Sequence, residues 1–332
     1  MNLHPFLLAC VFLACCSKSP DNNPGSGNPA DPGKWPTQPA LPVVSGNASF
    51  VISKTEWSVN VMGNTAPRMP LFPSVPVKKG YARGYVADLA GRPLKGATIG
   101  LRATLVGGSY SGASGKTNDN GYYEIKLPFG ACQYYTTATT IAYGAGQAVV
   151  GLYPADGDIE SFASDDGDVQ NFVMLSYAPG DPEEIASQPN NETNYYGGTL
   201  YFNYQINYAA ESYPTYLPND GEIEIELVPE GAGLFGETKS FKITRSIGTT
   251  LFSINNIPVG KYSIKARLKN GPDLHMKATG PVANVYQHFG LKPDDVTGNS
   301  TVMFTPTWQS TPQMVPAFRS NWDALTITLS LP

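Results

Sequence analysis

The sequence is short of charge, of histidine and of cysteine. Only 15% of its 332 residues are charged, against about 25% in an average soluble protein, and 22 basic and 27 acidic residues leave a net charge of −5. No block of like charges occurs, so nothing in the chain attracts a polyanion, and nucleic acid is not expected as a partner. Three histidines and four cysteines leave little material for metal ligation or nucleophilic catalysis.

Motifs that carry known catalytic chemistry are also missing. The two histidines of the body, His275 and His288, belong neither to an HExxH motif nor to the HxxE pair of a metallocarboxypeptidase. No GxSxG elbow occurs, and Gly115-Lys116-Thr117 lacks the first glycine of a phosphate-binding loop because Tyr110 stands there. No Cys or His pair has the spacing of zinc ligands. We therefore expect a protein that is not an enzyme and holds no resident cofactor.

A long hydrophobic run is absent too. Residues 5–14 are apolar, but this run is about half as long as a helix that crosses a bilayer. A short apolar run near the N-terminus is typical of a secretory signal peptide, although residues 1–4 supply no Lys or Arg.

The residues after this run indicate an anchor. Leu13-Ala14-Cys15-Cys16 resembles the lipobox of bacterial lipoproteins, in which a cysteine is lipidated and becomes the mature N-terminus. Cys16 fits best, because Cys15 would put Phe12 at the leucine position. The resemblance implies a signal peptide over residues 1–15, a lipid anchor at Cys16 that makes the membrane a partner, and an outer-membrane lipoprotein on either the periplasmic or the cell-surface face. An ordinary secretory signal is the alternative.

The next segment, residues 16–46, is rich in Pro, Gly and Asn. It has almost no large apolar side chains before Leu41, so it cannot bury enough surface to form a core. We expect a disordered, semi-extended tether that separates the folded part of the chain from a membrane.

What the chain has in excess is glycine and proline, with 34 and 29 residues. Both residues interrupt helices, and helical periodicity is nearly absent from Phe50 onward. Short runs of alternating apolar and polar residues, bounded by turn residues, recur instead. The pattern predicts an all-β protein, and the length predicts two domains. The leading strands of residues 47–78 are left unassigned between the two domains.

One part of the body carries a series of turn and strand motifs. The series comprises Gly84-Tyr85-Val86, the turn Gly91-Arg92-Pro93-Leu94-Lys95-Gly96-Ala97, a hairpin over 116–125 that turns at Asp119-Asn120-Gly121, Leu127-Pro128-Phe129-Gly130, and a last strand over 169–175. It resembles the carboxypeptidase regulatory-like family, also called transthyretin-like, over about residues 79–177. The resemblance implies an immunoglobulin-like β-sandwich of about seven strands without a catalytic site of its own. Such domains are common in lipoproteins of Bacteroidetes-type bacteria.

Several residues of this domain have an expected place. Val86, Ile99, Tyr123 and Ile125 are expected to face inward, and the lone body cysteine, Cys132, is expected to be a small buried thiol.

A Pro- and Asn-rich break over 178–194 predicts a linker that proteases cut. It has room for one helical turn, with Asp181 as the cap and Pro182 at the first helical position. Residues 195–332 then alternate again, which predicts a second immunoglobulin-like sandwich. Within it, residues 252–264 form a strand, Pro-x-Gly turn and strand unit that is similar to residues 124–133.

An acidic segment precedes the last strand of the first domain. It contains Asp156, Asp158, Asp165, Asp166 and Asp168. Because Ca²⁺ takes about six to eight oxygen ligands, the segment is a candidate calcium site. Its spacing is not that of an EF-hand, and a solvated turn rich in Asp and Gly is the alternative.

Tyrosines crowd the start of the second domain. Alternation along one strand directs Leu200, Phe202 and Tyr204 toward the core. The opposite face carries Tyr201, Asn203, Gln205 and Asn207. An aromatic ring beside amide groups suits a sugar, whose C–H face stacks on the ring while its hydroxyls take hydrogen bonds. These four residues are the predicted glycan-binding face, and an ordinary solvated strand face is the alternative.

These features predict a membrane-anchored, non-catalytic binding or adhesion lipoprotein whose partner is a glycan or a surface protein. The alternative function is an accessory structural or protein-interaction component of a surface nutrient-uptake assembly.

Overall fold

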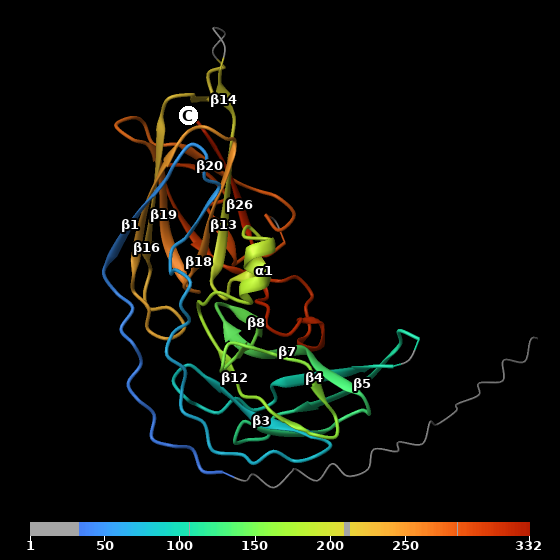
Figure 1. Ribbon diagram of the computed structural model, residues 1–332. Helices are drawn as coiled ribbons and strands as arrows, with labels where there is room; N and C mark the ends of the chain where they lie inside the picture. The colour runs from blue at the N-terminus through green and yellow to red at the C-terminus, as the bar shows by residue number, and fades with distance from the viewer. Residues whose placement is uncertain (1–32, 106, 209–212, 284) are drawn as a thin grey trace, which may run out of the picture. The chain divides into compact units, whose positions relative to one another are not determined.

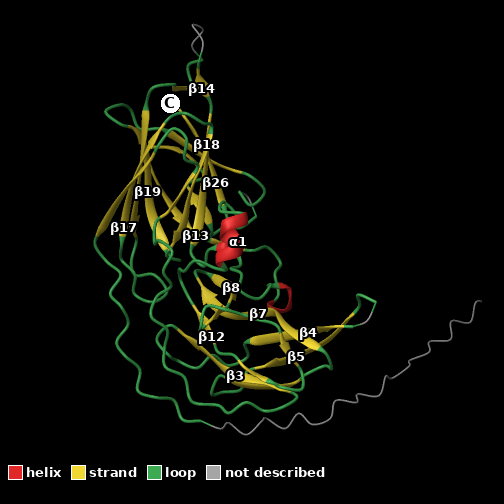
Figure 2. Cartoon of the chain, viewed as in Figure 1, coloured by secondary structure: helices red, strands yellow, loops and turns green. Residues whose placement is uncertain are grey.

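A computed structural model describes residues 33–332 except 106, 209–212 and 284. Strands make up nearly all of its regular structure, and α1 (Pro182–Ser187) is the single α-helix of the described residues (Figure 2). The all-β prediction is confirmed, and the strands form two β-sandwiches. The predicted signal peptide, Cys16 and the first part of the tether lie outside the described residues.

The second sandwich has two sheets of six strands each. Sheet A has the order β1 (Asn47–Ile52), β17 (Ser240–Ser246), β16 (Glu222–Pro229), β19 (Lys261–Leu268), β23 (Asn299–Met303) and β21 (Gly290–Lys292). Sheet B has the order β2 (Ser58–Asn60), β18 (Leu251–Ile257), β13 (Gly198–Tyr204), β26 (Leu325–Ser330), β20 (His275–Thr279) and β22 (Asp295–Thr297). Phe202, Ile225, Ile264 and Ile327 are fully buried in its core. Two separate two-stranded sheets are formed by the same part of the chain. They pair β14 (Ile206–Asn207) with β15 (Leu217–Pro218) and β24 (Thr305–Pro306) with β25 (Trp322–Asp323).

The leading strands β1 and β2 belong to the second sandwich. β1 pairs in parallel with β17, from Asn47 opposite Ser240 to Ile52 opposite Arg245, and β2 pairs in parallel with β18. Figure 1 shows β1, in blue, within the group of yellow and orange strands that contains β16 and β19. In chain order, β1 and β2 of the second sandwich come first, the strands of the first sandwich follow, and the remaining strands of the second sandwich come last. The predicted second domain, 195–332, lacks these two strands.

The first sandwich is built from β3 to β12. Sheet C has the order β10 (Phe162–Ala163), β7 (Ala131–Tyr143), β4 (Thr98–Thr104) and β5 (Tyr110–Lys116), with β8 (Gly146–Gly151) paired to β7. Sheet D has the order β11 (Asp168–Val169), β3 (Tyr81–Asp88), β12 (Phe172–Met174) and β9 (Tyr153–Pro154), with β6 (Tyr122–Lys126) paired to β3. Val86, Ile99, Tyr123 and Ile125 are buried, as predicted.

The predicted hairpin at residues 119–121 is wrong. β5 pairs with β4 in sheet C, whereas β6 pairs with β3 in sheet D, so the turn carries the chain from one sheet to the other. The two Pro-x-Gly turns, at 128–130 and 258–260, are sheet crossings as well, because each joins strands of opposing sheets. Gly121 has φ +72°, and such a tight turn serves a crossing as well as a hairpin.

The end of the predicted tether is ordered. Trp35 packs against Phe72 and Tyr85, with ring centroids 5.6 and 5.4 Å away, and its Nε1 donates to the Asn120 carbonyl at 3.0 Å. Gln38 is hydrogen-bonded to the backbone of Leu71 in both directions. Disorder over residues 33–46 was therefore a wrong expectation, because one tryptophan gives this Pro-rich segment an apolar anchor.

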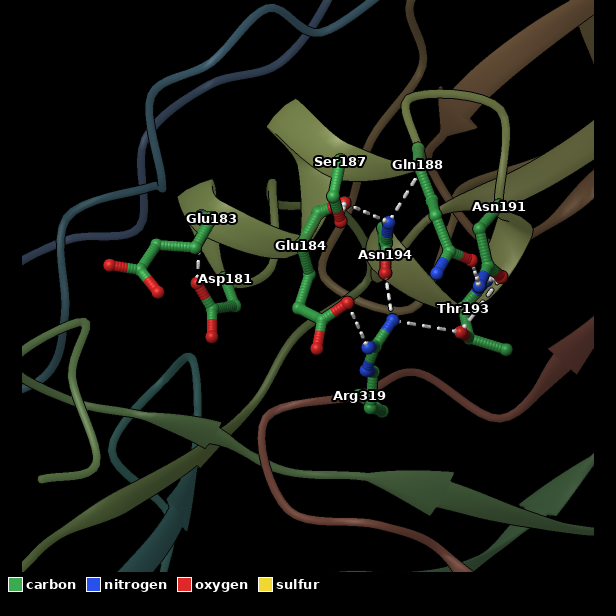
Figure 3. A network of polar contacts seen from close by, with 9 residues as sticks. All are labelled: Asp181, Glu183, Glu184, Ser187, Gln188, Asn191, Thr193, Asn194 and Arg319. Carbon is green, nitrogen blue, oxygen red and sulfur yellow. Dashed lines mark hydrogen bonds and ion pairs between the residues drawn. The ribbon is translucent and has the colours of Figure 1, made fainter. Parts of the chain in front are cut away.

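The linker is held by polar contacts. α1 begins as predicted, with the Asp181 side chain accepting from the Glu183 N–H at 2.9 Å. After it, the 3₁₀ turn η1 (Glu192–Asn194) buries Asn194, whose amide donates to the carbonyls of Glu184 and Gln188 at 3.0 and 2.8 Å. Figure 3 shows the Arg319 guanidinium pointing at both parts: it pairs with Glu184 at 2.7 Å and donates to Asn194.

Asn256 joins the points where the chain leaves and re-enters the second sandwich. Its side-chain nitrogen donates to Asn60 Oδ1 at 3.1 Å, at the end of β2. Its side-chain oxygen accepts from the N–H groups of Ala178 and Gly197 at 3.0 and 3.3 Å. The residue is fully buried and has φ +62°.

Candidate functional site

The predicted glycan-binding face is the outer face of sheet B. Leu200, Phe202 and Tyr204 are at most 1% exposed, whereas Tyr201 and Asn203 are half-buried and Gln205 is exposed. The predicted alternation is thus confirmed. The face continues across the sheet, because Asn203 lies opposite Thr328 of β26 and Thr328 in turn lies opposite Lys277 of β20.

Two of the four predicted residues are engaged elsewhere. The Tyr201 hydroxyl donates to the Asn190 carbonyl in the linker, and burial together with the nearby Glu192 carboxylate raises the pKa of Tyr201 to about 12. The Asn207 amide donates to the Tyr213 carbonyl at 3.0 Å and accepts from the Tyr213 N–H at 2.9 Å. Tyr201 therefore fastens the linker, and Asn207 fastens a loop.

The other two residues line a hollow. Asn203 and Gln205, with Thr215, Tyr216, Thr328 and Ser330, surround about 270 Å³ of space, which we call the sheet B hollow. Its lining side chains carry no charge. At its edge the Tyr216 ring lies 4.7 Å from the ring of Tyr213, tilted by 30°, and Tyr213 is 53% exposed.

This arrangement offers hydroxyl and amide groups beside a half-buried aromatic ring. Hydroxyls and amides both donate and accept hydrogen bonds, so they match the hydroxyl groups of a sugar in either sense. The Tyr216 ring supplies an apolar face for stacking. The hollow is chemically suited to a neutral, hydroxyl-rich ligand.

Three residues that line the hollow were not among the predicted site residues, although the sequence carries a partial signal for them: Thr328, Ser330 and Tyr216. Alternation from Leu325 to Leu331 already placed Thr328 and Ser330 on an outer face. That this face adjoins Asn203 depends on the parallel pairing of β13 with β26, which has no local signature. Tyr216 stood among the crowded tyrosines, and its position follows from the loop that Asn207 holds.

Of the other reactive side chains of the body, His275 is hydrogen-bonded and Cys132 is buried, whereas His288 is exposed. Both ring nitrogens of His275 have partners: Nε2 lies 2.8 Å from Asp295 Oδ1 and Nδ1 lies 3.1 Å from Thr297 Oγ1. Cys132 is a buried free thiol, as predicted. Its Sγ donates to the Pro128 carbonyl at 3.3 Å, and burial raises its pKa.

The acidic segment is divided by the fold. Asp156, Asp158 and Asp168 line a hollow of about 280 Å³, whereas Asp165 and Asp166 are exposed residues of the turn that follows β10. The Tyr134 hydroxyl donates to Asp168 at 2.7 Å, and burial, which outweighs this bond, raises the pKa of Asp168. Among the described residues no group of three or more His, Cys, Asp or Glu is placed to hold a metal ion, so the structure gives the calcium hypothesis no support.

Within residues 33–332 as described, no helix has the length and apolar character needed to cross a membrane.

Comparisons with known proteins do not assign a family. No protein-family model matches the sequence, and no curated protein does. Among solved structures, the chain is similar to the Bacillus anthracis TIE protein at 18% identity, with a TM-score of 0.22, over 57% of this chain and 29% of that one. It is also similar to a streptococcal ancillary pilin at 10% identity, with a TM-score of 0.20, over 73% of this chain and 62% of that one. The chain thus spans less than two thirds of the length of either. Its resemblance to the carboxypeptidase regulatory-like family stays a prediction.

Proposed function

We propose that this chain is a lipid-anchored, non-catalytic binding or adhesion module of a bacterial outer membrane, and that it holds a neutral glycan in the sheet B hollow. The observation that carries the proposal is the composition of the hollow. Uncharged residues supply hydroxyl and amide groups on the outer face of sheet B, and the neighbouring loop adds the Thr215 hydroxyl and the Tyr216 ring; a preformed polar surface binds with little loss of conformational entropy.

The proposal is tested by isothermal titration of neutral oligosaccharides into the protein without its predicted signal peptide and anchor, residues 33–332, which we call the soluble body. Tyr216→Ala and Gln205→Ala should each weaken binding, with about a tenfold loss for every 1.4 kcal/mol of lost stacking or hydrogen bonding. Neither change empties the core, so the melting temperature should stay near that of the wild type.

Two controls make the test specific. Tyr110→Ala removes a tyrosine that is 56% exposed on the first sandwich and should leave binding unchanged. Phe202→Ala removes a fully buried ring that does not line the hollow and should lower stability by about 3 kcal/mol through an unfilled core. If no member of the panel binds the wild type, the sheet B hollow is not a glycan site.

The anchor is tested at Cys16. Cys16→Ser removes the sulfur that would carry the lipid, and each buried methylene of such a lipid contributes about 0.8 kcal/mol of membrane binding. The variant should move from the detergent phase to the aqueous phase in a partitioning experiment. If Cys16→Ser still incorporates labelled palmitate, Cys15 is the anchor or the chain carries no lipobox.

A protein partner is the second candidate, and one surface favours it. At the end of the β4–β5 pair, three large apolar side chains are exposed: Leu105 by 40%, Tyr110 by 56% and Phe129 by 80%. Exposed apolar side chains in one region mark protein interaction sites. Cross-linking on intact cells that is lost in Phe129→Ser, with glycan binding unaffected, would identify this end as a partner surface.

A further inference from the structure

A second hollow lies away from sheet B, between the β7–β8 pair of the first sandwich and the loop from Pro306 to Pro312. It encloses about 360 Å³, and we call it the junction hollow. On the first sandwich its lining includes Thr140 and Gln147, which stand on neighbouring strands. On the second sandwich it includes Thr307, Gln309, Ser310 and Thr311.

The loop that forms one wall is held at both ends. At its start β24 pairs with β25, and the Thr307 N–H donates to the Asn321 carbonyl at 3.1 Å. At its end the Thr136 hydroxyl of β7 donates to the Pro312 carbonyl at 2.8 Å. The Asn321 amide also donates to the Val149 carbonyl of β8 at 2.8 Å. The two walls are therefore fixed relative to each other, and a ligand would find the site already formed.

The lining side chains carry no charge and are rich in hydrogen-bonding groups. Hydroxyls of Thr and Ser and the amides of Gln147 and Gln309 both donate and accept. A phosphate or carboxylate ligand would call for Arg or Lys here, and none lines the hollow. The chemistry selects a neutral ligand with many hydroxyl groups.

An exposed tryptophan stands beside this polar lining. Trp308 does not itself line the hollow: it lies between two lining residues, Thr307 and Gln309, and is 51% exposed. The Tyr286 ring, which itself lines the hollow, meets it edge-on with centroids 5.1 Å apart. Gln309 has φ +51°, a conformation that is costly for a residue with a side chain. The loop thus presents an indole and an amide to solvent at some cost in stability, as functional sites do.

We propose that the junction hollow is a second carbohydrate subsite, in which a neutral sugar ring stacks on the aromatic pair formed by Tyr286 and Trp308 and its hydroxyls bond to Gln147 and Gln309. The subsite deepens the proposed function and rests on it, since both need a glycan ligand. It also assigns a role to the contact between the two sandwiches: each supplies one wall of the site.

The test uses the complete soluble body and neutral tetrasaccharides of glucose, mannose and N-acetylglucosamine. Trp308→Ala should weaken binding of at least one tetrasaccharide by tenfold or more. Trp57→Ala is the matched control, because Trp57 is also a half-exposed indole, at 53%, and it should leave binding unchanged. A second readout is the indole N–H resonance of Trp308, identified by its loss in Trp308→Phe, which should shift on titration while that of Trp57 does not.

The outcomes separate this subsite from the sheet B hollow. One outcome is that Tyr216→Ala weakens binding, Trp308→Ala does not, and the Trp308 indole resonance of the wild type does not shift on titration. The junction subsite is then overturned and the proposed function stands. If the indole moves and Tyr216→Ala has no effect, the subsite is supported and the sheet B hollow is overturned. If no tetrasaccharide binds the wild type, both are overturned. A cross-linked protein partner that is lost in Trp308→Ala, with no sugar binding, also overturns the subsite.

Discussion

Asn256 has a backbone conformation that glycine would adopt at lower cost, with φ +62°. An asparagine is present because its amide bonds in two directions at once. It donates to Asn60, where the chain leaves the second sandwich, and accepts from Ala178 and Gly197, where the chain returns. A glycine would leave these two buried N–H groups without a partner, and each such group costs about 1–3 kcal/mol.

Replacing Asn256 separates the two effects. Asn256→Gly should lower the free energy of unfolding by about 2–4 kcal/mol through the lost hydrogen bonds, and Asn256→Ala by about 1 kcal/mol more because of its backbone conformation. Urea denaturation followed by circular dichroism measures both. Asn270 is the control, since it has φ +60° and is exposed; Asn270→Gly should be neutral or slightly stabilising. Equal stability of Asn256→Gly and the wild type would show that the amide contributes nothing.

The contribution of the Glu224 carboxylate to folding stability should depend on pH. Glu224 is 6% exposed and lies between Arg267 and Lys242, at 2.6 and 3.1 Å. Burial raises its pKa, but the bonds to Lys242 and Arg267 outweigh burial, so its pKa is lowered in the folded protein. A lowered pKa stabilises the folded state above the unfolded value of 4.5, and this stability is lost as the pH falls through the folded value.

Glu224→Gln should therefore lower the free energy of unfolding by about 1 kcal/mol at pH 7, and the difference from the wild type should shrink as the pH falls below 4.5. Denaturant titrations at a series of pH values measure it. Glu226→Gln on the same strand is the control, because Glu226 is 43% exposed and 3.7 Å from Lys242. A penalty for Glu224→Gln that persists unchanged at low pH would exclude the ionic explanation.

At the scale of elements, α1 and η1 form a linker to which one distant side chain, Arg319, is bound. Neither element buries an apolar residue, so tertiary packing of the usual kind does not hold them. Arg319 reaches them from the other end of the sequence, pairing with Glu184 and donating to Asn194. We therefore expect these contacts to slow proteolysis of the linker, in contrast to the cleavage that its composition predicts.

Arg319→Met should expose the linker to a glutamate-specific protease, which cuts after Glu183, Glu184 or Glu192. Cleavage should be several-fold faster than in the wild type while the midpoint of global unfolding moves little, because the affected segment is local. Arg68→Met, at an exposed arginine, is the control. Equal cleavage rates in wild type and Arg319→Met would mean that the guanidinium does not protect the segment.

The elements also show how far the sequence predicts this structure. The inward positions of Leu200, Phe202 and Tyr204 follow from a period of two, which is a local property. The place of β1 does not, because it is set by pairing with β17, far along the chain. The same limit applies to the site: alternation put Tyr201 on the outer face, but that its hydroxyl is bound to Asn190 depends on the fold of the linker.

At the scale of the whole molecule, the first sandwich is an insertion within the second. Asn60 and Gly197 both bond to the side chain of Asn256, so the two ends of the insertion lie close together. Close ends are the property that lets one domain be inserted into, or removed from, another.

This geometry predicts that residues 46–63, joined to 195–332 by a short Gly/Ser linker, fold without the first sandwich. The joined chain should unfold cooperatively on heating. Residues 195–332 alone should not, because sheet A and sheet B would each lose an edge strand and Ile52 would leave the core. Circular dichroism melts of the two chains decide the matter. A cooperative melt of 195–332 at the same temperature would make β1 and β2 dispensable.

The parallel pairing of β2 with β18 also sets an order in time. Asn60 and Asn256 are 196 positions apart, and at about 5–20 residues per second the second leaves the ribosome roughly 10–40 s after the first. The strands of the first sandwich are contiguous in the sequence and have all their partners within that interval. Once folded, this sandwich shortens the loop that must close between β2 and β18 and so lowers its entropic cost. We therefore expect the inserted sandwich to fold first and the second sandwich to close last, when β18 pairs with the much earlier strand β2.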